Sequence, residues 1–221
     1  MRFAFFHVGS DITQPKRLVE SIYESNPNAE IHMASDEVTP PIPGVGHRVN
    51  IRGDRKEIMS MRLAGFAALM LSQPTFYLDT DMIVLEKLNP SDLLGDKQIL
   101  FLRRTFNREV LFNPHFRDMD LTEYTNRSMD EVYPYIAACT VTRDWKPWGE
   151  MFAMLDHMNP KFKSWYGDQE ALKLYSLSVP NKQMAFLHER DYACLPEHRD
   201  QYTPKILHYK GAARKQLFEV S

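Results

Sequence analysis

Apolar residues in the first part of the chain alternate between short runs and a helical spacing. Residues 2–7 form a short apolar run, which predicts a buried strand. Residues 13–26 then carry apolar side chains at the helical period, with Pro15 in the first turn, and residues 30–34 form a second short run. A strand, a helix and a strand in this order predict the opening of an α/β fold with a parallel sheet.

Residues 55–71 give the strongest helix prediction. The segment contains no proline, is rich in Ala, Met and Leu, and repeats its apolar residues at the helical period. Arg62 is the one arginine within the apolar part of this segment, and a cation in such a place needs an anionic partner, either a carboxylate or a phosphate. Pro74 ends the helix, and the apolar run 76–78 predicts a buried strand directly after it.

The rest of the chain continues the α/β pattern. Short apolar runs predict strands at residues 49–51, 99–102, 135–141, 183–187 and 206–208, and helical spacing predicts helices at residues 148–157 and 168–177. Residues 39–44 are a proline-rich loop. Residues 103–129 are polar with scattered aromatics, and a connection of this length is typical of a functional segment or a small subdomain.

Two carboxylates, Asp79 and Asp81, follow the strand at 76–78 directly. Carboxylates at the end of a buried strand are costly unless a positive charge pairs with them, and a divalent cation supplies that charge. In open α/β sheets ligands bind beyond the carboxyl ends of the strands. Mg²⁺ and Mn²⁺ take oxygen ligands and keep positions for substrate phosphates, so one or two carboxylates suffice. The alternative is a pair of turn-forming or capping residues.

The Asp-x-Asp spacing alone does not identify this site. The chain contains 15 aspartates, enough for one such spacing to arise by chance, and a second copy does occur at Asp118 and Asp120. No predicted strand leads into the second copy, so it serves as an internal control. The position of Asp79 and Asp81 after a buried strand is therefore the informative feature.

A basic turn follows the last predicted strand, which ends in His208. This histidine is either structural or the third ligand of a metal site. Lys210, Arg214 and Lys215 could meet phosphate oxygens. Gly211 would let the backbone approach a ligand closely. The combination with the upstream carboxylates favours the metal site.

Asp168 and Gln169 stand at the start of a predicted helix, where an aspartate is also an ordinary cap. Aromatic residues near them could offer flat faces to a sugar, although aromatics in such positions more often belong to a core. These residues are Trp145, Trp148, Trp165 and Tyr166.

Composition excludes several classes of function. A hydrophobic content of 43% supports a packed core, and a net charge of −2 argues against nucleic acid as the main partner. No apolar run approaches the roughly 20 residues of a transmembrane segment, and the N-terminus lacks the apolar length of a signal peptide. The two cysteines, Cys139 and Cys194, are expected to be reduced thiols, and the expected location is cytoplasmic.

Several motifs together resemble those of nucleotide-sugar glycosyltransferases with the GT-A fold, most closely the retaining families 8 and 34. The motifs are Arg62, Asp79-Thr80-Asp81, Asp168-Gln169 and His208-Tyr209-Lys210-Gly211, in this order. The resemblance implies one GT-A domain over residues 1–221, in which a Rossmann-like half (1–102) with a mixed central sheet flanked by helices is fused to an acceptor-side half (103–221). It also implies a nucleotide-diphosphate sugar, expected to be a UDP-sugar, as donor, a glycan or other hydroxyl acceptor, and Mn²⁺ or Mg²⁺ as cofactor.

The resemblance also implies roles for individual residues. The metal ligands would be Asp79, Asp81 and His208. The ends of the first two strands would form a nucleoside pocket, with His7, Gly9 and Asp36. Other donor contacts would come from Arg62, Asp79, Thr80, Lys210, Gly211, Arg214 and Lys215. The catalytic positions beside the transferred sugar would be Asp168 and Gln169.

The chain departs from the family pattern in two places. Family 8 has a lysine six residues after the histidine, whereas this chain has Arg214 there, followed by Lys215. The Asn-Ala-Gly segment typical of the middle strand is replaced by residues 137–139, which read Ala-Ala-Cys. Retention is implied by the resemblance alone. An inverting enzyme would need a carboxylate base, for which Asp144, Glu150 and Asp168 are candidates.

Three other functions are compatible with parts of the sequence. A haloacid-dehalogenase-type phosphatase would use Asp79 as its nucleophile, but it also needs a later acidic pair after a strand, which is not found. A nucleotidyltransferase would open with a glycine-rich phosphate loop, which residues 8–11 do not form. A catalytically silent nucleotide-sugar-binding module is the remaining alternative.

Overall fold

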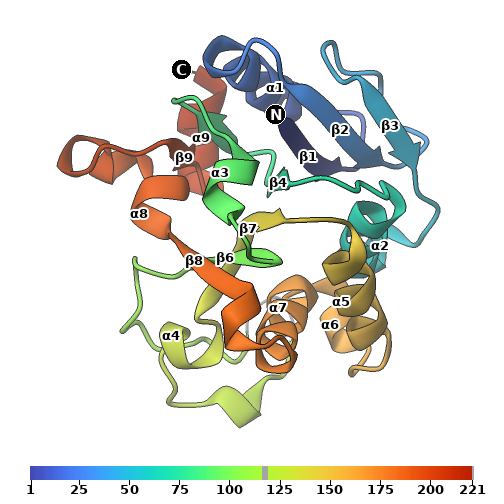
Figure 1. Ribbon diagram of the computed structural model, residues 1–221. Helices are drawn as coiled ribbons and strands as arrows, with labels where there is room; N and C mark the ends of the chain where they lie inside the picture. Colours follow the sequence, from blue (N-terminus) through green and yellow to red (C-terminus); the bar gives the residue numbers. More distant parts are fainter. Residues whose placement is uncertain (116–118, 221) are drawn as a thin grey trace.

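The computed structural model describes residues 1–115 and 119–220 and has an α/β fold around a seven-stranded mixed sheet (Figure 1). The strand order is β3-β2-β1-β4-β7-β6-β8. The strands are β1 (Arg2–His7), β2 (Glu30–Ser35), β3 (His47–Asn50), β4 (Thr75–Leu78), β6 (Ile99–Arg103), β7 (Tyr135–Thr142) and β8 (Met184–His188). The first four strands run parallel, β7 is antiparallel to both β4 and β6, and β8 is parallel to β6. The predicted mixed central sheet is confirmed.

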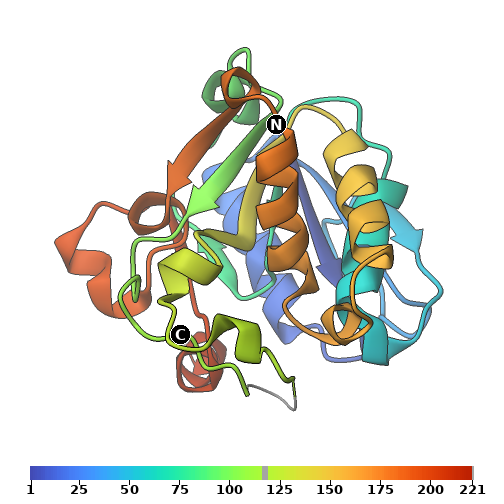
Figure 2. The same ribbon diagram turned by 90° about the horizontal axis from the view of Figure 1, so that it is seen from below.

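Helices cover both faces of this sheet, as Figures 1 and 2 show. The longer helices are α1 (Thr13–Ser25), α2 (Ile58–Ala68), α5 (Lys146–Asp156), α7 (Gly167–Ser178) and α9 (Ala212–Val220). The shorter helices are α3 (Pro90–Leu94), α4 (Met129–Val132), α6 (Lys161–Ser164) and α8 (Glu189–Tyr192), and short 3₁₀ turns cover Arg55–Glu57, Thr122–Tyr124, Asn181–Gln183 and Pro196–Gln201. Helix α1 packs on one face, and α2, α5 and α7 pack together on the other.

The alternation of side chains along the central strands builds two cores. Phe76 and Leu78 of β4 point into the core beneath α1, whereas Tyr77 between them points into the core beneath α2 and α5. All three side chains are at most 1% exposed. A strand buried on both faces reads as a continuous apolar run, which is why residues 76–78 carry no polar side chain before the aspartates.

A glycine brings α2 close to the sheet. A Cβ atom on Gly65 would lie 2.4 Å from Ile51 Cδ1 and 2.9 Å from Ala34 Cβ, so a side chain at this position would push the helix outward. This packing fixes the position of the helix that carries Arg62.

A separate two-stranded sheet brings the C-terminal part of the chain to the end of β4. Strand β5 (Met82–Val84) pairs with β9 (Ile206–His208) in antiparallel fashion, with Met82 opposite His208. Beyond this pair, the N–H group of Tyr209 donates to the carbonyl of Asp81 at 2.9 Å. The residues that follow the central strand and the residues that follow the last strand therefore meet at one place.

Most predicted elements are present with shifted ends. The helix predicted at 55–71 is a 3₁₀ turn followed by α2, which ends at Ala68, and Met70 has a left-handed backbone with φ of 48°. Helix α9 and the four short helices were not predicted. Segments of four or five residues are too short to show a helical period, and the first residues of α9 were interpreted as part of the basic turn after His208.

Sheet topology does not separate the two predicted halves at residues 102 and 103. Strand β6 crosses this point and pairs with β7 and β8, so the sheet continues through it, and the division stays a prediction.

In residues 1–115 and 119–220, no helix combines the length and apolar character needed to cross a membrane.

Candidate active site

A cavity of about 490 Å³ opens at the carboxyl end of β4. It is lined by many of the residues that the sequence singled out, which come from α2, the β4–β5 turn, the start of α7 and the segment after β9. These are Arg62, Asp79, Asp81, Asp168, Gln169, His208, Lys210, Gly211 and Lys215. The predicted site residues that do not line it are His7, Gly9, Asp36, Thr80 and Arg214.

Asp79, Asp81 and His208 form a cluster whose potential ligand atoms all lie within 4.8 Å of one another. His208 Nε2 is 3.3 Å from Asp81 Oδ1 and 3.9 Å from Asp79 Oδ2. Asp81 and His208 are buried, and Asp79 is partly exposed. Two carboxylates suit Mg²⁺ and Mn²⁺, and an imidazole nitrogen is a ligand that transition metals accept more readily than Mg²⁺ does. The donor set of this cluster therefore fits the predicted cofactor.

The charges around Asp81 keep its carboxyl group ionised. Burial opposes ionisation, but the hydrogen bond and charge of His208 and the charge of Lys215 outweigh it and hold the pKa of Asp81 well below its usual range. Lys215 Nζ lies 3.1 Å from Asp81 Oδ2. A metal ligand has to be deprotonated, and this environment ensures that Asp81 is.

Arg62 has the anionic partners that its sequence position predicts. Its Nη2 lies 2.6 Å from Asp79 Oδ1 and donates to the carbonyl of Ala137 at 2.8 Å, while its Nη1 lies 3.3 Å from Asp168 Oδ2. Although burial disfavours the charged guanidinium, the two carboxylates raise the pKa of Arg62 above its usual value. Arg62 thus joins the turn between β4 and β5 to the start of α7.

Asp168 is not the cap of α7, because the capping position is Tyr166 and no side chain caps the helix there. Burial raises the pKa of the Asp168 carboxyl, the nearby charge of Asp79 raises it further, and Arg62 opposes both effects. A buried carboxylate held by an arginine at a cavity wall is typical of a functional position rather than of a helix start.

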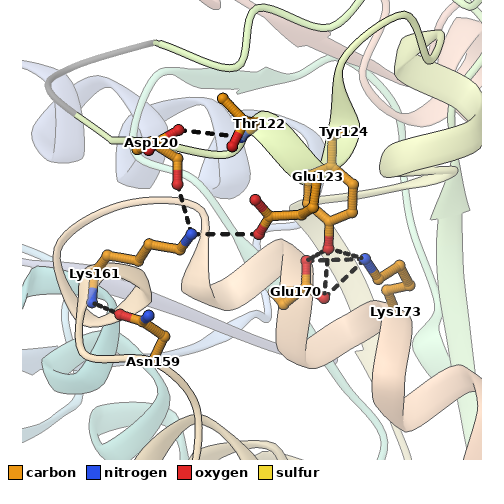
Figure 3. A network of polar contacts seen from close by, with 8 residues as sticks. All are labelled: Asp120, Thr122, Glu123, Tyr124, Asn159, Lys161, Glu170 and Lys173. Carbon is orange, nitrogen blue, oxygen red and sulfur yellow. Dashed lines mark hydrogen bonds and ion pairs between the residues drawn. The ribbon is translucent and has the colours of Figure 1, made fainter.

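A polar network fixes the helix that carries Asp168 and Gln169 (Figure 3). Glu170 is buried in the first turn of α7; it lies 2.7 Å from Lys173 Nζ and accepts the hydroxyl of Tyr124 at 3.1 Å. Lys161 reaches across to the carbonyl of Asp120 at 2.5 Å and to Glu123 at 3.3 Å. The network ties the segment at 120–124 to α6 and α7.

The proposed nucleoside residues lie at the ends of β1 and β2, outside the cavity. The carboxylate of Asp36 accepts the N–H groups of Thr39 at 3.0 Å and of Gly9 at 3.4 Å, and it is also bound by Arg55. Gly9 has φ of +112°, a conformation that side chains rarely adopt. The role of Asp36 in this structure is to hold the loop after β1.

The basic turn presents a different cation from the one at the family position. Arg214 Nε lies 2.8 Å from Glu197 Oε2, and its Nη1 donates to the carbonyl of Lys210, so its side chain points away from the cavity. Lys215 reaches the cavity instead. Gly211, with φ of +91°, makes the turn possible and lines the cavity beside Lys210.

The control copy of the Asp-x-Asp spacing does not form part of this site. Asp118 lies outside the described residues, and Asp120 is exposed and does not line the cavity.

Of the aromatic residues, Trp148 is a core residue that is 1% exposed, whereas Trp165 and Tyr166 line the cavity. The suggestion that Trp148 offers a face to an acceptor is therefore wrong.

Arg104 is a cavity residue that the sequence reasoning missed. It follows β6 and is only 4% exposed. Its Nε donates to the carbonyl of Tyr133 at 2.9 Å, and its Nη2 donates to Gln169 Oε1 at 3.4 Å. The available signal was a pair of arginines, Arg103 and Arg104, directly after a buried strand.

Comparisons with known proteins establish the fold. No protein-family model and no curated protein matches the chain. The structure is similar to that of the glycosyltransferase GlyE from Streptococcus pneumoniae TIGR4, with a TM-score of 0.61 and 14% identity; the match covers 100% of this chain but only 60% of GlyE.

Two further solved structures match over most of their own length. The galactosyltransferase LgtC, in complex with donor and acceptor sugar analogues, has a TM-score of 0.55 and 16% identity over 96% of this chain and 88% of that chain. A glycosyltransferase involved in glycosylation of the major capsid of PBCV-1 has a TM-score of 0.63 and 10% identity over 99% of this chain and 97% of its own. The chain thus has the GT-A fold that the sequence motifs implied.

Proposed function

We propose that the protein transfers a sugar from a nucleotide-diphosphate sugar to a hydroxyl group of an acceptor. The observation that carries this proposal is the cluster of Asp79, Asp81 and His208 on the wall of a cavity that also contains Lys210 and Lys215. A metal-bound diphosphate is suited to such a combination of metal ligands and nearby cations. The GT-A fold shared with known glycosyltransferases supports the same function.

The residues of the chain divide the work at the donor. A divalent metal, Mn²⁺ in preference to Mg²⁺, would act as a Lewis acid that offsets negative charge on the departing diphosphate. Lys210 and Lys215 would add positive charge to the same group. Arg62 contacts both Asp79, beside the proposed metal, and Asp168, beside the proposed sugar. These contacts would fix the position of the metal relative to the sugar.

The nucleoside of a UDP-sugar would extend from the metal toward the ends of β1 and β2. There, His7 and Gly9 would contact it, and Asp36 would act by holding the loop after β1, because its carboxylate is already engaged. Thr80 and Arg214 would contribute only indirectly, since neither lines the cavity.

Retention of configuration is part of the proposal. Neither Asp144 nor Glu150 lines the cavity, and Asp168, which does, is held by Arg62. No candidate carboxylate of the sequence is therefore both in the cavity and free to act as a base toward an acceptor. Asp168 and Gln169 would instead lie beside the transferred sugar, and the acceptor would be a glycan or another hydroxyl compound.

Binding and turnover measurements test the proposal. Calorimetry should show UDP binding that depends on Mn²⁺, and a panel of nucleotide sugars should show metal-dependent hydrolysis or transfer. Asp79→Ala combined with Asp81→Ala should abolish both. Asp96→Ala is the matched control, because Asp96 is exposed, does not line the cavity and pairs with its neighbour Lys97 at 2.8 Å.

Two results would contradict the proposal. Full Mn²⁺ binding and turnover in the double variant would show that the carboxylates do not hold the metal. Nucleotide-sugar binding without hydrolysis or transfer, across a broad acceptor panel, would identify a silent binding module instead.

A further inference from the structure

Arg104 carries a buried positive charge on the wall of the proposed sugar site. Its side chain is held by two neutral acceptors, the carbonyl of Tyr133 and the amide oxygen of Gln169. Among the side chains that the structure describes, those of residues 1–115 and 119–216, none forms a carboxylate ion pair with Arg104 within 4.0 Å. Arg62 in the same cavity differs, because it contacts two carboxylates.

The nearby acidic residues each bind another partner through one carboxylate oxygen, and the second oxygen of Asp130 is buried without a hydrogen-bond partner. Glu189 Oε2 accepts the N–H groups of Thr105 at 2.7 Å and Phe106 at 2.8 Å. Asp130 pairs with Arg108 at 2.5 Å. Both act on Arg104 only through space. Since burial lowers the pKa of an arginine but leaves it ionised at neutral pH, Arg104 is a buried cation without a contacting counter-ion.

A bound anion would compensate this charge, and the position of Arg104 points to the sugar end of the donor. Arg104 contacts Gln169, which adjoins Asp168, and its charge also acts on Lys210, whereas Lys215 contacts Asp81 of the metal cluster. Ala137 and Ala138 of β7 also line the cavity, and their side chains offer no hydrogen bonds to a sugar. Arg104, Asp168 and Gln169 would therefore supply polar contacts to the sugar, beside Arg62, which holds Asp168.

We propose that Arg104 binds a carboxylate on the transferred sugar, so that the donor is a nucleotide-diphosphate uronic acid. This inference rests on the proposed function and specifies its substrate class. The planar guanidinium matches a carboxylate with two parallel hydrogen bonds, which a neutral hydroxymethyl group cannot provide. A neutral hexose would leave the buried charge of Arg104 uncompensated, so the site selects against it.

Three ligands separate the possible anions in a calorimetric experiment with Mn²⁺ present. The wild type should bind UDP-glucuronate or UDP-galacturonate at least about tenfold more tightly than the matching UDP-hexose. Arg104→Met should remove that preference and leave the affinity for UDP unchanged. Arg103→Met is the matched control, since Arg103 is the exposed neighbour whose guanidinium lies 5.8 Å from the ring centre of Phe186.

Each contrary result identifies a different error. If UDP itself does not bind, the proposed function fails. If UDP binds but the uronic acid donor is not preferred, the inference about Arg104 fails while the proposed function stands. If Arg104→Met weakens UDP and its sugar conjugates equally, the anion is the diphosphate, which also overturns the inference.

The acceptor sugar is the second possible source of a carboxylate. Transfer from a neutral donor to acidic and to neutral acceptors separates the two sources. A preference for acidic acceptors that Arg104→Met removes would place the carboxylate on the acceptor and overturn the assignment to the donor. Arg104→Lys serves if the Met variant does not fold; it keeps the charge but not the two-pronged geometry, and should reduce the preference for the uronic acid donor.

Discussion

The ammonium group of Lys215 lies 3.1 Å from Asp81 Oδ2, on a carboxylate that we propose as a metal ligand. A divalent ion and this ammonium group would repel each other and compete for the same oxygen atoms. Lys215→Met should therefore strengthen binding of Mn²⁺ alone several-fold, or by about 1 kcal/mol, and should weaken the binding of UDP in the presence of Mn²⁺. Calorimetric titrations with the metal alone and with the nucleotide measure the two effects separately.

Arg214→Met is the informative comparison, because Arg214 is paired with Glu197 outside the cavity. We expect a smaller change in both affinities than for Lys215→Met. If the Arg214 variant loses more UDP affinity than the Lys215 variant, then Arg214, which stands at the position of the family 8 lysine, binds the phosphates of UDP.

The two aspartates of the cluster differ in their contacts, which predicts different roles. Asp81 is closer to His208, at 3.3 Å, whereas Asp79 is 3.9 Å from His208 and is engaged by Arg62 at 2.6 Å. Asp81→Asn should weaken Mn²⁺ binding about tenfold more than Asp79→Asn, a difference of about 1.4 kcal/mol. Titrating each variant with Mn²⁺ and following the free ion by electron paramagnetic resonance measures this. Equal losses would show that both carboxylates ligate the metal directly.

The sequence was most informative where one periodicity dominated. Short apolar runs and helical spacing predicted β1, α1, β2 and β4, and the carboxylates at the end of β4 predicted the place of the site. This works because a strand buried on both faces carries mostly apolar side chains and excludes unpaired charges until it ends. Arg62 was identified for the same reason, as a cation that an apolar helix could not leave unpaired.

The orientation of individual cations could not be predicted. Successive residues of a helix point about 100° apart, so the choice between Arg214 and Lys215 depends on where α9 begins, and that helix was not predicted. A register shift between Phe101 and Leu102 has a similar effect after β6, because it changes which face the following residues point to. Arg104 was missed for this reason.

Arg62 and Arg2 form ion pairs of the same length in different surroundings, which predicts different effects on stability. Both pairs have a shortest N–O distance of 2.6 Å. In the first pair the side chains of Arg62 and Asp79 are 12% and 27% exposed, and in the second pair those of Arg2 and Glu30 are 22% and 58% exposed. Arg62→Met removes the cation that pairs with the buried Asp168 and the partly exposed Asp79, and should lower the free energy of unfolding by about 3–5 kcal/mol. Arg2→Met should lower it by about 1 kcal/mol or less.

Urea unfolding followed by circular dichroism measures both changes. Adding Asp168→Asn to Arg62→Met should recover part of the lost stability, because it removes one of the uncompensated charges. If the two arginine variants lose equal stability, burial does not determine the strength of these pairs.

The Asp36 carboxylate predicts a loss of stability in acid. Burial opposes its ionisation, but hydrogen bonds from Thr39, Arg55 and Gly9 lower its pKa from 3.8 to about 2. The unfolded chain therefore binds a proton at this residue before the folded chain does. The stability that Asp36 contributes is fully present above pH 4, falls as the pH drops from about 4 to 2, and amounts to on the order of 1–2 kcal/mol.

Urea unfolding at several pH values between 6 and 2 tests this dependence. Asp36→Asn removes the titrating group, so its stability should change less with pH over the same range than that of the wild type. An unchanged pH dependence in the variant would mean that other carboxylates, such as Glu197 beside Arg214, account for the acid sensitivity.

Met70 is a backbone feature whose replacement should stabilise the fold. It is the second residue after α2, following the C-cap Leu69. It has φ of 48°, donates its N–H group to the carbonyl of Ala67 at 3.0 Å, and exposes 65% of its surface. A left-handed residue after a helix is commonly glycine, because a Cβ atom is strained there by about 1–2 kcal/mol. Met70→Gly should raise the free energy of unfolding by about 0.5–1 kcal/mol, after the larger entropy of glycine in the unfolded chain is subtracted. Met70→Ala removes the same exposed side chain but keeps the Cβ atom, so urea unfolding should show no comparable gain; equal gains in the two variants would assign the effect to the exposed side chain and not to the backbone.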